Sequence, residues 1–178
     1  MLDTASLRGD AEFELIDLRD HPLPHLDEAV PPMFGPSPHA ATRAWTERIA
    51  PFDGFLMVTP EYNGGMPGVL KNAIDHVFAE WVNKAVGFVS YGVDGGARSV
   101  VRLRTVCGTL GLADVGYQVS ISVLTDFENH ATFVPNDRHL VTPARPSTRS
   151  SPGAPRSRRC APKPLSSTPE ELRNVCFQ

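Results

Sequence analysis

Two short glycine-bearing segments contain the residue types that could hold a flat organic ring. Glycine lets the backbone approach a ligand closely, tyrosine offers an apolar face with a polar hydroxyl, and asparagine both donates and accepts hydrogen bonds. The candidate binding residues are Pro60, Glu61, Tyr62, Asn63, Gly64 and Gly65 in the first segment, and Ser90, Tyr91, Gly92, Gly95 and Gly96 in the second.

Each of these segments follows a run of consecutive apolar residues. The runs are GFLMVT at 54–59 and AVGFVSY at 85–91, and both are typical of strands buried on two faces, as in a parallel sheet covered by helices. Ligands of open parallel sheets bind at the carboxyl ends of the strands. We therefore expect both segments to line one crevice.

The surrounding sequence alternates between strand and helix patterns. Apolar residues recur at helical spacing in three stretches, and the last predicted strand alternates more than the others, which places it nearer the sheet edge. This alternation predicts an open parallel α/β sheet with right-handed crossovers. The further predicted strands are 13–18 and 115–123, and the predicted helices are 40–49, 67–80 and 98–112.

Three blocks of this chain resemble the NADPH-dependent FMN reductases, a flavodoxin-like family that includes quinone, azo-dye and chromate reductases. The blocks are Thr59 to His76, Glu80 to Val86 and Ser90 to Arg98. The match runs from about Glu12 to about Val123, and it is specific because the three blocks occur in the family's order and spacing.

The resemblance implies a flavodoxin-like three-layer parallel sheet that binds FMN. In the family, the positions matching Pro60 to Asn63 and Ser90 to Gly92 contact the isoalloxazine ring. NADPH or NADH would supply the hydride, a quinone-like or other small molecule would accept the electrons, and a homodimer or homotetramer is expected. Since the cofactor performs the chemistry, we expect no catalytic side chain and no metal.

The start of the chain differs from the family pattern. The strand at 13–18 resembles the family's second strand, and no strand with a G-S-x-R phosphate loop precedes it. We expect a fold without the first strand and the last helix, produced by a truncated start and a frame-shifted end. The flanking strands would then pair directly or accept a strand from a partner chain, and FMN would bind weakly without its phosphate cradle.

Composition divides the chain near residue 139. Residues 1–139 hold 10 basic and 18 acidic residues (net −8), whereas residues 140–178 hold 7 basic and 2 acidic residues (net +5). The second part is rich in Pro, Ser and Arg, which predicts a disordered tail. Thr168 followed by Pro169 could start a short helix over 169–177. We therefore expect a partial flavodoxin-like domain at 1–139 and a tail at 140–178.

Several classes of function find no support in the sequence. A net charge of −3 argues against nucleic acid, and no apolar run is long enough to span a membrane. Three widely spaced cysteines fit a reducing cytoplasm. Lys71, Asp75 and His76 are interpreted as solvated helix residues, and prolines between His21 and His25 argue against a metal site.

Two alternatives to the reductase remain open at this stage. One is a non-catalytic remnant or interaction protein that no longer holds FMN. The other is a flavodoxin-type electron carrier, which the Glu61-Tyr62-Asn63 and Tyr91-Gly92 blocks fit less well than they fit a reductase.

Overall fold

The apolar runs of the sequence become the strands of a parallel sheet. The computed structural model describes residues 11–134, 136, 139 and 172–177. Every predicted strand is present, with ends shifted by a few residues. These strands are β1 (Ala11–Ile16), β2 (Gly54–Pro60), β3 (Ala85–Gly92) and β4 (Ala113–Ser122).

The three predicted helices are also confirmed. They are α2 (Ala40–Ile49), α3 (Gly68–Asp75) and α4 (Ala97–Thr109), and two short 3-10 turns, η1 (Leu18–Asp20) and η2 (Pro32–Phe34), lie between β1 and α2. Helix α3 ends five residues before the predicted end at residue 80. The chain turns there to bury Trp81, whose indole N–H donates to the Ile74 carbonyl at 3.1 Å.

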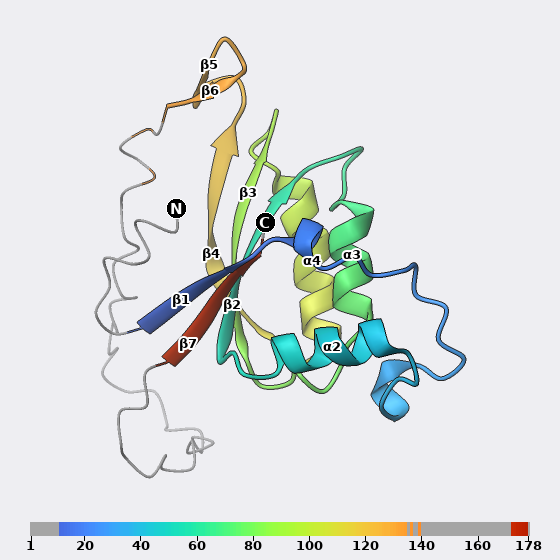
Figure 1. The fold of residues 1–178 in the computed structure, drawn as a ribbon. Coiled ribbons are helices and arrows are strands. Elements are labelled where there is room, and N and C mark those ends of the chain that lie inside the picture. The colour runs from blue at the N-terminus through green and yellow to red at the C-terminus, as the bar shows by residue number, and fades with distance from the viewer. Residues whose placement is uncertain (1–10, 135, 137–138, 140–171, 178) are drawn as a thin grey trace, which may run out of the picture.

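The sheet has the strand order of a flavodoxin-like fold. The order is β1-β7-β2-β3-β4 and all neighbouring pairs are parallel, so β4 lies at the edge as predicted (Figure 1). A separate two-stranded antiparallel ribbon, β5 (Phe127–Glu128) with β6 (Thr132–Phe133), follows β4. The predicted α/β class is confirmed.

The central position of the sheet is filled from the far end of the chain. Strand β7 (Leu172–Phe177) pairs with β1 from Ala11↔Leu172 to Ile16↔Phe177, and with β2 from Gly54↔Asn174 to Met57↔Phe177. The expected empty position is therefore occupied, and β1 and β2 neither pair directly nor receive a strand from a partner.

The predicted helix over 169–177 is wrong for residues 172–177. A helix of about ten residues is marginal by itself, whereas a position between two parallel strands offers hydrogen bonds to backbone groups on both sides. The predicted disorder at 140–168 falls on residues outside those that the structure describes.

Helices α2, α3 and α4 all cover the same face of the sheet (Figure 1). Between them and the sheet lies a core that contains Trp45, Trp81 and Cys107. Phe55 and Trp81 meet edge to face, with ring centroids 4.7 Å apart. Each such side chain contributes roughly 1.5–3 kcal/mol by leaving water.

Candidate functional site

The first glycine-bearing segment is a tight hairpin at the end of β2. The Tyr62 N–H donates to the Gly65 carbonyl at 2.9 Å, and the Gly65 N–H donates to the Tyr62 carbonyl at 3.0 Å. The two residues between them, Asn63 (φ 51°) and Gly64 (φ 76°), both have left-handed backbone. Asn-Gly is the pair that a two-residue turn of this kind prefers, so the sequence dictates the hairpin.

The second segment is a glycine turn that leads from β3 into α4. Gly95 (φ 67°) and Gly96 (φ 73°) are both left-handed. A Cβ on Gly96 would lie 2.6 Å from the Ser90 Cβ, and one on Gly95 would lie 2.9 Å from the Ser120 Cβ. These glycines are required because the turn packs tightly on Ser90, which is buried, and on Ser120, which is half-buried. Ser90 is itself buried and donates to the Gly95 carbonyl at 2.6 Å.

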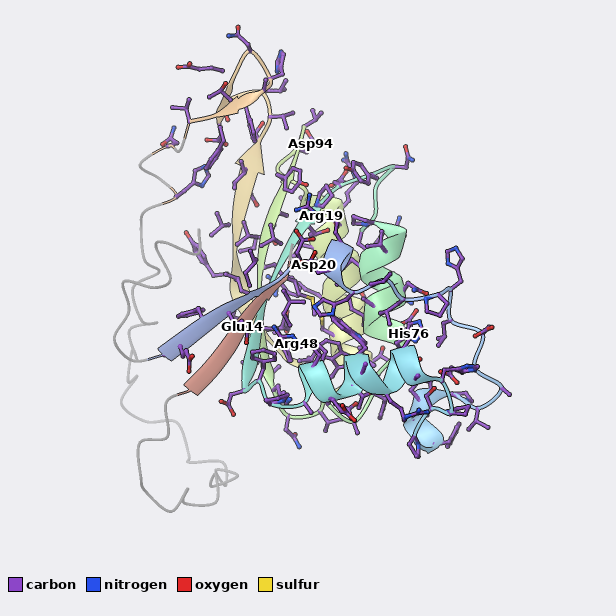
Figure 2. The ribbon with its side chains drawn as sticks, viewed as in Figure 1. Glu14, Arg19, Asp20, Arg48, His76 and Asp94 are labelled. Atoms are coloured by element: carbon purple, nitrogen blue, oxygen red, sulfur yellow. The ribbon has the colours of Figure 1, made fainter. Side chains whose placement is uncertain are left out.

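The two segments lie side by side at the carboxyl edge of the sheet, as the strand pattern predicted. Pro60 pairs with Tyr91 in the β2–β3 ladder, and the Glu61 N–H donates to the Tyr91 carbonyl at 3.0 Å. Figure 2 shows Asp94 of the second segment at this same end of the molecule. The sheet thus brings together two turns that are about thirty residues apart in the chain.

Two aromatic side chains stand at this edge. Tyr62 is 63% exposed and Tyr91 is 36% exposed. Partial burial, with a smaller effect of the nearby Tyr62, raises the pKa of the Tyr91 hydroxyl above its usual value of 10.0. The Tyr91 phenol is therefore neutral at physiological pH, and the two rings together offer apolar faces at the surface, where large aromatic groups are seldom left uncovered.

Helix α4 holds the first segment through two arginines, an arrangement that local sequence patterns did not predict. The Glu61 carboxylate accepts from the Arg98 backbone N–H at 2.9 Å and from the Arg98 Nε at 2.6 Å. Arg102, one turn further along, donates from Nε to the Gly64 carbonyl at 2.7 Å. Two arginines four residues apart, directly after a glycine turn, were the only sequence signal for this arrangement.

His76 is not the solvated residue that the sequence suggested. Its side chain is buried between α2 and α3 (Figure 2), where Nδ1 lies 2.9 Å from the Thr42 hydroxyl and Nε2 lies 3.0 Å from the Pro24 carbonyl. Lys71 and Asp75 instead form an ion pair at 2.6 Å. His76 therefore holds the segment after β1 against the helices and lies away from the two turns.

A cavity of about 550 Å³ lies at the end of β1, between the turn η1 and helix α3. Its polar lining includes Asp17, Arg19, His21 and Asn72. Hydrogen bonds from Arg19 lower the pKa of the Asp17 carboxyl to about 2, so this pair carries opposite charges across the physiological range. Among the described residues, no group of three or more metal-ligating side chains could hold an ion.

The described residues contain no helix that is both long and apolar enough to cross a bilayer.

Comparison with known proteins gives a consistent family. The model of a family described as NADPH-dependent FMN reductase matches residues 1–126. An NAD(P)H-dependent FMN reductase of Schizosaccharomyces pombe is 45% identical over 101 residues, which are 56% of this chain and 50% of that protein. A 2-hydroxy-1,4-benzoquinone reductase of a Burkholderia species is 36% identical over 111 residues, 58% of this chain and 57% of that protein. The chain thus spans about half the length of the curated relatives it matches.

A solved structure shares the fold. It is FerB, a flavoenzyme NAD(P)H:(acceptor) oxidoreductase from Paracoccus denitrificans, with a TM-score of 0.58 and 23% identity over 77% of this chain and 76% of that one. At this identity the likeness concerns the arrangement of strands and helices alone.

Proposed function

Because this chain belongs to the NADPH-dependent FMN reductase family, we propose that it is an NAD(P)H-dependent oxidoreductase that binds FMN and passes electrons to a quinone-like or other small acceptor. The observation that carries the proposal is the direct contact between the two turns, through the Glu61 N–H and the Tyr91 carbonyl. This contact supports a single planar site built from Pro60 to Gly65 and Ser90 to Gly96.

The residues at the two turns fit the ring of a flavin. The exposed face of Tyr62 offers apolar contact, and Gly64 lies against the Arg98 side chain, where an added Cβ would be 3.9 Å from the Arg98 Cδ. Asn63 can donate to and accept from polar ring edges. When bound, FMN supplies the hydride chemistry, while the chain binds the ring and orients it.

The described residues offer fewer binding groups for the phosphate of FMN than for its ring. No glycine-rich loop that opens a helix follows β1 or β7 within the described part of the chain. Phosphate binding usually depends on such a loop, since its N–H groups and the helix dipole neutralise the anion. We therefore propose that the two turns supply contacts to the ring rather than to the phosphate.

The acceptor, the assembly and the cell compartment complete the proposal. Relatives that are named quinone reductases support a small-molecule acceptor. We expect a homodimer or homotetramer, as is usual in the family, and a cytoplasmic protein. The hydride donor is NADPH or NADH.

Purification followed by flavin titration tests the proposal. We expect the protein mixed with FMN to quench flavin fluorescence and to oxidise NADPH when a soluble benzoquinone is present. Flavin binding without NADPH oxidation would favour an electron carrier. If the protein neither binds flavin nor oxidises NADPH in excess FMN, the proposal is refuted and a non-catalytic remnant is the remaining interpretation.

A further inference from the structure

The N-terminus of helix α4 cannot be capped by its own N-cap residue. That residue is Gly96, and its side chain position is closed because a Cβ there would lie 2.6 Å from the Ser90 Cβ and 2.9 Å from the Tyr91 N. The left-handed backbone (φ 73°) also disfavours other residues. A helix start without a capping side chain leaves N–H groups of its first turn unsatisfied.

The missing cap is supplied by Glu61, which lies 37 residues earlier in the chain. Its Oε2 accepts from the N–H of Arg98, the second residue of α4, at 2.9 Å. This is the donor that an N-cap side chain normally satisfies. The negative charge also lies at the positive end of the helix dipole. Glu61 therefore caps α4 in place of Gly96.

The same residue fixes the distance between the two turns. The Glu61 backbone N–H is bonded to the Tyr91 carbonyl, and its Oε1 is bonded to the Arg98 side chain at 2.6 Å. The Glu61 side chain is only 8% exposed, whereas that of Arg98 is 60% exposed. Its carboxylate is thus committed to helix α4, and the residue joins the hairpin, the end of β3 and the helix start.

We propose that the Glu61 side chain has a positioning role: it sets the spacing of the two flavin-binding turns by capping α4, and it does not itself contact the ring. This inference rests on the proposed function, because it assigns a role within the flavin site. Removal of the Glu61 carboxylate has two opposing effects on flavin binding. Loss of its negative charge would strengthen binding of the anionic FMN phosphate, whereas loss of the correct spacing between the two turns would weaken binding of the ring.

The test compares Glu61→Ala with Glu61→Gln by fluorescence titration of FMN and of riboflavin, which lacks the phosphate. We expect Glu61→Ala to weaken both flavins by a similar factor of about 3 to 30, the range that loss of a helix cap implies. Glu61→Gln should recover most of the affinity, because its amide oxygen can still accept from the Arg98 N–H. Asp114→Ala is the matched control, since Asp114 pairs with Arg104 of the same helix away from the turns. Its flavin affinities should change less than about twofold.

Hydrogen exchange of the protein without flavin measures the cap independently. We expect the Arg98 amide to exchange at least about tenfold faster in Glu61→Ala. Unchanged riboflavin affinity or an unchanged Arg98 amide would overturn the inference. If the wild-type protein binds neither flavin, the proposed function fails, and a fast Arg98 amide in Glu61→Ala would still establish the cap.

Discussion

Proline at position 175 should disrupt the centre of the sheet. Val175 pairs with Glu14 of β1 on one side and with Phe55 of β2 on the other. In a parallel sheet each backbone N–H of such a strand donates to one of its two neighbours. Proline removes that donor and leaves a buried carbonyl unsatisfied. Loss of the bond, about 0.5–1.5 kcal/mol, and the orphaned acceptor, about 1–3 kcal/mol, together predict a loss of about 1.5–4.5 kcal/mol.

Urea unfolding followed by tryptophan fluorescence measures this change, because Trp45 and Trp81 are both buried in the core. The free energy of unfolding of a typical domain is about 5–15 kcal/mol, so the urea concentration at the unfolding midpoint should fall clearly. Val175→Ala, which keeps the backbone N–H, is the control. Hydrogen exchange at Phe55 and Met57 should also accelerate in Val175→Pro. If Val175→Pro matched the control within about 0.5 kcal/mol and left this exchange unchanged, residues 172–177 would not form the central strand in solution.

Two further predictions concern helix α4 and its first turn. Gly96→Ala should lower the free energy of unfolding by at least about 2 kcal/mol, because the new methyl group meets Ser90 and the left-handed backbone disfavours alanine. Gly108→Ala is the control. Because an added Cβ there has nothing within 4 Å, this variant should raise the free energy of unfolding by up to about 1 kcal/mol. Burial raises the pKa of the Cys107 thiol from 9.0 to about 12, so its stabilising effect is complete below pH 9 and is lost as the pH rises toward 12. Cys107→Ala should therefore lose less stability between pH 8 and pH 10.5 than the wild type, as measured by urea midpoints, and equal losses would contradict the assignment.

The sequence predicted best those elements that depend on local patterns. The apolar runs at 54–59 and 85–91 became β2 and β3, and alternate residues such as Phe55 and Met57 are buried in the core. Burial on both faces was predicted, but the described helices cover one face, and Leu56 and Val58 are only half-buried. The Asn63-Gly64 pair specified its hairpin directly. Helix α3 was predicted five residues too long, because the burial of Trp81 is a tertiary effect that helical periodicity does not contain.

Features that depend on distant pairing could not be predicted in this way. Thr168 and Pro169 are local signals for a helix start, and they gave no information about an open position between β1 and β2 more than 100 residues away. The backbone bonds available in that position outweigh a marginal helix propensity. Likewise, the cap of α4 is supplied by Glu61, and capping rules that examine only neighbouring residues cannot find it.

The strand order divides the carboxyl edge of the sheet into two parts that depend differently on β7. The ring side stands on β2 and β3, which pair directly over seven residues from Gly54↔Ala85 to Pro60↔Tyr91 and do not need β7 between them. The side nearest the cavity stands on β1, which reaches β2 only through β7. Loss of β7 should therefore lower the stability of the domain more than it lowers the riboflavin affinity of the molecules that remain folded, because the contacts that space the two turns all lie on the other side of β2.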